Sequence, residues 1–191
     1  MFAWLKSLFQ KPPQSLPQLK MRRDNLDNLP EIIVPEGYVV RTYQPGDEAA
    51  WCDIMEGNVS SNWTVEKCRE KMIDDPRFQP DNLFFITHND QPVASVCAWS
   101  DDPENQIIGV IHMVAVLESH RGRGLGTLLN AVVLNRLKEL GYQQVTLNTD
   151  DWRLPAVKSY LTAGFHPDHL HESHPERWKT IFEQLGITKK K

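Results

Sequence analysis

The sequence predicts a mixed α/β domain: a single central sheet, mostly antiparallel, with flanking helices. Two apolar segments, residues 82–88 and 93–100, joined by the polar turn Asn89-Asp90-Gln91, predict an antiparallel hairpin. A strand, a long helix and a second strand then follow between residues 106 and 149, which predicts a βαβ unit with parallel strands. The length of 191 residues, with 40% hydrophobic and 24% charged residues, allows one sizeable core.

The chain is predicted to divide into an N-terminal extension, residues 1–30, and a folded domain, residues 31–191. Residues 11–30 carry four prolines among polar side chains, which favours a tether or an extended strap. The apolar run at residues 1–9 lacks the length and cleavage site of a signal peptide, so a surface-docking helix or a packed helix remain the alternatives. No segment has the roughly 20 apolar residues of a membrane span.

The first half of the domain is predicted to alternate strands with short helices. Asp47 follows a Pro-Gly turn and is placed to begin a helix, whereas Pro76 limits the next one. The predicted elements are a strand at 38–43, helices at 48–57 and from 64 to before 76, and strands at 82–88 and 93–100.

The second half contains the long helix. Leucine and valine recur at helical spacing after residue 125, and Gly141 supplies the stop. Around this helix the sequence predicts strands at 106–117 and 144–149, a helix at 155–163 that ends at Gly164, and a last helix at about 175–185.

A glycine-rich loop, His120-Arg121-Gly122-Arg123-Gly124-Leu125-Gly126-Thr127, joins the strand at 106–117 to the long helix. Glycines let backbone amides approach an anion, and the helix start adds unpaired N–H groups, so the loop fits a phosphate. An ordinary strand-to-helix turn is the alternative. The loop lacks the lysine of a P-loop, and it comes too late in the chain for a Rossmann unit.

Composition and residue spacing disfavour several other classes of function. A net charge of −4 and an isoelectric point near 6.0 disfavour nucleic acid as a partner. Three cysteines without CxxC spacing predict neither a disulfide framework nor a zinc site, and they favour a reducing cytoplasm. The histidines at 166, 169, 171 and 174 have loose spacing, which predicts a polar loop and no metal site.

The loop, read as Arg121-Gly122-Arg123-Gly124-Leu125-Gly126, resembles the Arg/Gln-x-x-Gly-x-Gly/Ala signature of the GNAT superfamily of N-acetyltransferases. The resemblance runs from about residue 38 to 165 and includes the spacing of Ala156, Tyr160, Gly164 and Phe165. The segments at 35–38 and 153–156 also look like those of mycothiol-synthase-like acetyltransferases.

The resemblance implies a site for acetyl-CoA as co-substrate and no metal. In the family, amides of the glycine loop bind the pyrophosphate, while a splayed strand binds the pantetheine arm and polarises the acetyl carbonyl. The implied cofactor-binding residues are Val114, Ala115, Val116, Arg121, Gly122, Arg123, Gly124, Leu125, Gly126, Thr127 and Arg153.

The resemblance also implies catalytic residues. Tyr160 matches the tyrosine that protonates the departing thiolate, the alternative being a core tyrosine. Glu118 follows the core strand and is the predicted base, with His112 and His120 as alternatives and a solvated surface carboxylate as the non-functional interpretation. Asp150 and Asp151 are placed either to steer a cationic substrate or to cap the next helix.

Two departures from the family pattern affect the expected site. Arg153 stands where many members have asparagine, and it is placed to contact a CoA phosphate or to neutralise Asp150. Beyond Phe165 the usual final pair of strands is hard to see, so another subunit of a homodimer is one source for the wall of the acceptor pocket.

The sequence thus predicts an N-acetyltransferase that moves an acetyl group directly from acetyl-CoA to a primary amine. The acceptor is a small molecule or a peptide. The alternative is a non-catalytic module that senses acyl-CoA or regulates a partner.

Overall fold

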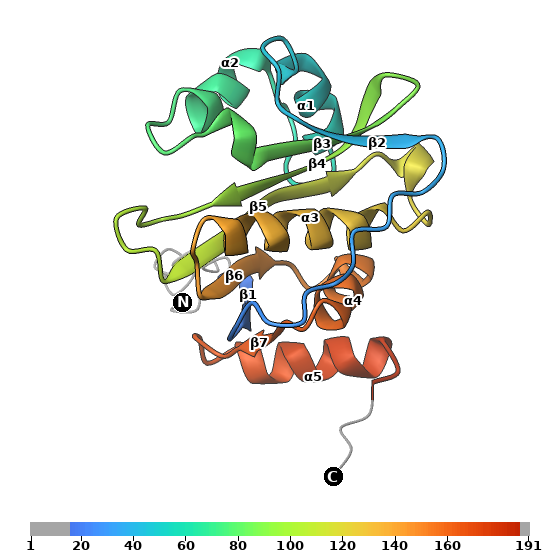
Figure 1. Ribbon diagram of the computed structural model, residues 1–191. Helices are drawn as coiled ribbons and strands as arrows, with labels where there is room; N and C mark the ends of the chain where they lie inside the picture. The colour runs from blue at the N-terminus through green and yellow to red at the C-terminus, as the bar shows by residue number, and fades with distance from the viewer. Residues whose placement is uncertain (1–15, 188–191) are drawn as a thin grey trace, which may run out of the picture.

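The computed structural model describes residues 16–187, and within this range seven strands form one sheet in the order β2-β3-β4-β5-β6-β1-β7 (Figure 1). The apolar run at 1–9 and the lysines at 189–191 lie outside the described residues. The strands are β1 (Leu19–Arg23), β2 (Tyr38–Thr42), β3 (Leu83–His88), β4 (Gln91–Trp99), β5 (Ile108–Val116), β6 (Gln144–Thr149) and β7 (His166–Asp168).

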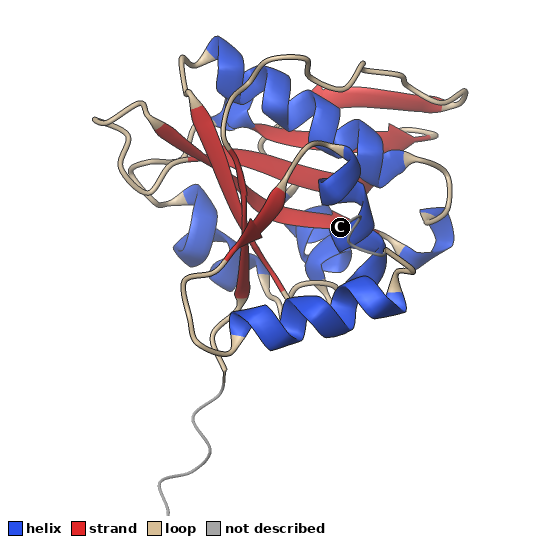
Figure 2. Ribbon diagram, turned by 90° about the horizontal axis from the view of Figure 1, so that it is seen from below, coloured by secondary structure: helices blue, strands red, loops and turns tan. Residues whose placement is uncertain are grey.

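Helices cover both faces of the sheet, and the residues of β4 alternate between two cores. Val96 and Ala98 belong to the core under the later helices, whereas Cys97 and Trp99 belong to the core under the first two. Figure 2 shows the strands in the middle of the molecule with helices around them. The helices are α1 (Glu48–Met55), α2 (Val65–Cys68), which continues as the π-helix η2 (Arg69–Ile73), α3 (Leu125–Glu139), α4 (Leu154–Thr162) and α5 (His174–Gln184), with 3₁₀ turns η3 (Pro80–Asn82) and η4 (Glu118–His120).

The helices α3, α4 and α5 confirm the helices predicted from the second half of the sequence, and β3 and β4 form the predicted antiparallel hairpin. β5 and β6 are parallel, as the βαβ interpretation requires. None of the helices between residues 16 and 187 is both long and apolar enough to cross a bilayer.

The sequence prediction missed β1, which lies inside the segment expected to be a tether or strap. β1 runs antiparallel to β6 on one side and to β7 on the other, with Leu19 opposite Thr149 and Lys20 opposite Asp168. Leu19 and Met21 are fully buried, whereas Lys20 between them is only half-buried. This alternation is the strand signal, but it spans only five residues beside a proline-rich stretch.

The last strand, β7, was also missed because it has three residues and contains Pro167. It pairs with β1 and with no other strand among the described residues. The strand that pairs with β7, which could not be identified from the sequence beyond Phe165, is therefore β1 from the N-terminal segment of the same chain.

The sheet opens between β5 and β6. These strands pair only where Ile108–Val110 meets Gln144–Thr146, although β5 continues to Val116 and β6 to Thr149. Met113 has a φ of 54°, and the pairing of β5 with β4 shifts by one residue at this point, which defines a β-bulge. The bulge redirects the end of β5, and beyond Val110 the edge of β5 that faces β6 has no strand partner among residues 16–187.

Arg23 connects the end of β1 to the end of α4 through hydrogen bonds. Its guanidinium donates to the carbonyl of Ala163, and its Nε donates to the carbonyl of Asn25 at 2.9 Å. Gly164 follows with a φ of +85°, and a Cβ there would collide with the guanidinium of Arg23. Gly164 therefore suits the left-handed backbone at this position, and a side chain here would have to displace the Arg23 guanidinium.

We predict that Gly164→Ala lowers the free energy of unfolding by about 2–4 kcal/mol, because the left-handed backbone and the displaced Arg23 both carry a cost. Gly186→Ala is the matched control, since Gly186 follows α5 with a φ of +67° and has open space around its Cβ position. The control should cost about 1 kcal/mol in denaturant unfolding. Equal losses for the two variants would contradict the role of Arg23.

Candidate active site

A cleft of about 660 Å³ opens where β5 and β6 part. Its walls come from the end of β5, the glycine loop, the first turns of α3, and α4 with the loop before it. The lining residues are Asn58, Val114, Ala115, Val116, His120, Arg121, Gly122, Gly124, Leu125, Gly126, Thr127, Asn130, Trp152, Arg153, Pro155, Ala156, Ser159 and Tyr160.

The glycine loop presents backbone amides to this cleft. Gly122 and Gly124 have φ values of +76° and +80°, a conformation that L side chains rarely adopt, whereas the space around both is open. Gly124 is the N-cap of α3, and no side chain caps the helix. The first amides of α3 therefore remain free for an anion, and the helix dipole adds positive potential at the same place.

The two arginines of the loop differ in position. Arg121 lines the cleft, where it donates to the side chain of Asn58 and, at 3.4 Å, to the carbonyl of Val116. Arg123 is exposed, reaches the carbonyl of Ser119 at 3.4 Å, and is not among the cleft-lining residues. The structure thus brings together every predicted cofactor-binding residue except Arg123.

Arg153 crosses the gap between the splayed strands. Its Nη2 donates to the carbonyl of Val114 at 2.9 Å, and its guanidinium lies 5.8 Å from the ring centroid of Trp152. No ion pair joins it to Asp150 within the described range, so the expected neutralisation of that carboxylate is wrong. Arg153 instead holds the backbone of β5 one residue after the bulge.

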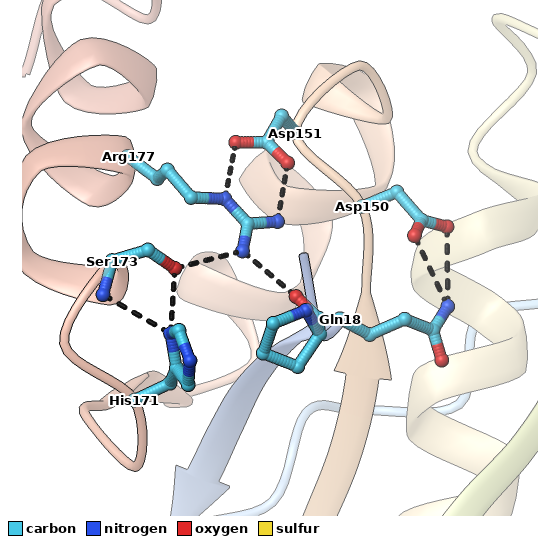
Figure 3. Close-up of polar contacts among 7 residues, drawn as sticks. Gln18, Asp150, Asp151, His171, Ser173 and Arg177 are labelled. Carbon is cyan, nitrogen blue, oxygen red and sulfur yellow. Dashed lines mark hydrogen bonds and ion pairs between the residues drawn. The ribbon is translucent and has the colours of Figure 1, made fainter. Parts of the chain in front are cut away.

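Asp150 and Asp151 are engaged in contacts with the N-terminal segment and α5 (Figure 3). Both oxygens of Asp150 accept from the Gln18 amide, at 3.1 and 3.3 Å. Asp151 forms a two-fold contact with Arg177 at 2.9 and 2.6 Å, and this pairing lowers the pKa of Asp151. Arg177 also donates to the carbonyl of Pro17 at 2.7 Å.

These contacts favour neither of the two roles predicted for the acidic pair. Neither carboxylate lines the cleft, and Asp151 already has a cationic partner in Arg177. Arg153 is the N-cap of α4, and no side chain caps that helix, so the capping alternative does not hold either. The pair instead anchors the loop that carries Trp152 and Arg153 to the cleft.

Tyr160 lies in the wall of the cleft, with 2% of its surface exposed. Its ring packs against Phe165 in an edge arrangement, with centroids 6.2 Å apart. Burial raises the pKa of its hydroxyl, with an opposing effect from the Arg153 charge. The hydroxyl therefore keeps its proton at neutral pH.

The three predicted base candidates occupy different positions. Glu118 is exposed on η4 and does not line the cleft. His120 does line it, 2.9 Å from the Tyr38 hydroxyl, and burial together with Arg123 and His88 lowers its pKa. His112 lies outside the cleft and stacks on Trp99 with ring centroids 5.5 Å apart.

Sequence reasoning missed Asn130 and Ser159 as cleft residues. Asn130 is on α3 and Ser159 is on α4, and the two side chains meet at 2.8 Å. A signal was present, because Asn130 is a polar residue on a helix whose neighbouring positions are leucine, alanine and valine. In the part of the chain that the structure describes, no group of three or more His, Cys, Asp or Glu residues could hold a metal ion.

The model of the acetyltransferase (GNAT) family matches residues 48–165, more than half of the chain. The chain belongs to the GNAT family. Its GNAT region includes α1, the sheet strands β3 to β6, the glycine loop and α4, and therefore all of the residues that line the cleft.

Mycothiol acetyltransferases are similar to this GNAT chain in sequence. The Thermomonospora curvata protein is 33% identical over 157 residues, covering 77% of this chain and 50% of the relative. The Nocardia farcinica protein is 32% identical over 152 residues, covering 74% and 50%. The chain thus spans about half the length of the curated relatives it matches.

The fold is also that of solved GNAT structures. A GCN5-related N-acetyltransferase from Sphaerobacter thermophilus superimposes with a TM-score of 0.63 at 25% identity, covering 80% of this chain and 50% of that one. The predicted fold class is confirmed.

We predict that His112 makes stability depend on pH. Burial lowers its pKa, the Arg77 charge adds to this and Asp101 opposes it. The unfolded chain therefore binds the proton more readily, so stability should fall as pH drops through about 6.5, by at most about 1.4 kcal/mol per pH unit. Denaturant unfolding of the wild type and His112→Gln between pH 7.5 and 5.5 measures this slope. Identical slopes would contradict the prediction.

Proposed function

We propose that this GNAT chain transfers an acetyl group from acetyl-CoA to a primary amine of a small molecule or peptide, directly in a ternary complex. The observation that carries the proposal is one cleft containing the uncapped start of α3, the free edge of β5 and the protonated Tyr160. Family membership and the similarity to mycothiol acetyltransferases support the same reaction class.

The described residues fit an acyl-CoA donor. The free amides of Gly124 to Thr127 suit a pyrophosphate, and Arg121 adds a cation beside them. β5 has no strand partner beyond Val110 on its β6 side, so this edge can bind an extended arm through its backbone. CoA would supply an acetyl thioester, whose carbonyl carbon accepts the amine.

The bulge in β5 suits the acyl carbonyl. A backbone N–H fixed at this edge stabilises the negative charge that develops on the carbonyl oxygen, and rigidity makes the donor effective. Arg153 contributes this rigidity, because it crosses the gap and binds the carbonyl of Val114. We therefore assign Arg153 a positioning role in place of the CoA phosphate contact considered from the sequence.

Tyr160 is the proposed proton donor. A departing thiolate needs a proton, and burial keeps the Tyr160 hydroxyl protonated. Two of the predicted bases remain for the amine: His120 lines the cleft and has a lowered pKa, whereas no carboxylate lines it among residues 16–187. Glu118 could act only from its exposed position on η4, through water.

The lack of a cleft carboxylate in the described range favours one second candidate function, a non-catalytic acyl-CoA-binding module. Such a module would use the same donor site and would need no base. It would bind acetyl-CoA and release no thiol.

The free, buried thiols of Cys52, Cys68 and Cys97 support a reducing compartment, and we propose a cytoplasmic location on that basis.

A thiol-release assay with acetyl-CoA and a panel of small amines and peptide N-termini tests the proposal. We expect release with at least one primary amine and acetylated product by mass spectrometry. CoA binding without release for every amine would favour the non-catalytic module.

We predict that Tyr160→Phe lowers kcat about 100-fold while acetyl-CoA affinity stays within about threefold, because only the proton donor is lost. Glu118→Gln is measured beside it as a test of the predicted base, and we expect its kcat to stay within about threefold since Glu118 does not line the cleft. If Tyr160→Phe weakens binding and leaves kcat unchanged, Tyr160 is structural. A loss of about 100-fold in Glu118→Gln would identify Glu118 as the base predicted from the sequence.

A further inference from the structure

A polar pair interrupts the apolar contact between α3 and α4. The Asn130 side chain amide donates through Nδ2 to the Ser159 hydroxyl at 2.8 Å, and Asn130 is 1% exposed. The neighbouring residues of α3, Leu129 and Ala131, are fully buried in the core. Both members of the pair line the cleft.

The pair retains one free acceptor and one free donor. Asn130 Oδ1 is buried and has no hydrogen-bond partner among the described residues. The Ser159 oxygen accepts from Asn130, so its own hydrogen remains available, and no described group accepts it. A buried polar atom without a partner is costly, and such an atom in a binding cleft indicates a ligand group or an ordered water.

The position of the pair limits which part of a ligand it can meet. A Cβ at Gly126, one turn before Asn130, would lie 3.8 Å from the Ser159 hydroxyl oxygen. Gly126 belongs to the first turn of α3, where the free amides begin, and Ser159 directly precedes Tyr160. The pair therefore shares one wall with both the proposed anion site and the proposed proton donor.

We infer that Asn130 and Ser159 bind an amide group in the arm of the acyl-CoA donor and so position that arm in the cleft. A secondary amide carries one N–H donor and one carbonyl acceptor, which complement the free Asn130 oxygen and the free Ser159 hydrogen. The pantetheine arm contains two such amides. The inference rests on the proposed function for the identity of the ligand, and on the geometry of this chain for the contact.

Binding measurements on the full chain separate this role from a structural one. Calorimetric titration of Asn130→Leu should show CoA affinity reduced about tenfold or more, because the ligand amide loses its acceptor. ADP at millimolar concentration is the second probe, since it carries the pyrophosphate and lacks the arm, and its affinity should stay within about twofold. Ser159→Ala, which removes only a hydroxyl, should weaken CoA in the same direction.

Asn135→Leu is the matched control. Asn135 is on the same helix, donates to the carbonyl of Ala131 at 2.8 Å, and does not line the cleft. Asn135→Leu should change the affinity for neither CoA nor ADP. Equal loss of CoA and ADP binding in Asn130→Leu, or unchanged CoA binding in both Asn130→Leu and Ser159→Ala, would overturn the inference. These experiments measure binding and not catalysis. A chain that binds CoA without turnover would therefore contradict the proposed acetyl transfer, but it would not contradict this inference.

Discussion

The early end of the pairing between β5 and β6 is the constraint on which the rest of the site depends. Three residue pairs hold the strands together, and beyond Val110 the bulge at Met113 turns β5 away. A continuous ladder would satisfy more backbone groups, so other groups must bond to those that the gap leaves without a strand partner. Arg153 is one of them, through its bond to the carbonyl of Val114.

The opening in the sheet also explains the organisation of the other half of the molecule. Beyond the point where β6 leaves β5, β6 is paired only on its other side, with β1. All five residues of β1 pair with β6, from Val145 to Thr149. Gln18 and Pro17, just before β1, are held by Asp150 and, through Arg177, by Asp151. The N-terminal segment therefore supports the loop that brings Trp152 and Arg153 to the cleft.

Much of the donor side of the site could be predicted from local sequence. Gly122 and Gly124 adopt the left-handed conformations that their residue type favours. Tyr160 is expected from the resemblance to the GNAT motif, and it lies on α4. Glu118 shows the limit of such reasoning. It follows β5 closely in sequence, yet the turn η4 directs the chain so that the carboxylate is exposed and His120 lines the cleft.

The sequence by itself determined the glycine loop, the long helix and the parallel βαβ unit, because each depends on residues within a few turns of one another. The tertiary structure alone decided which strand lies between β6 and β7, and which partners Asp150, Arg153 and Asn130 have. These contacts join positions far apart in the chain, for example by 132 residues for Gln18 and Asp150. Pairings of that kind depend on how the whole sheet is assembled, and local propensity carries no information about them.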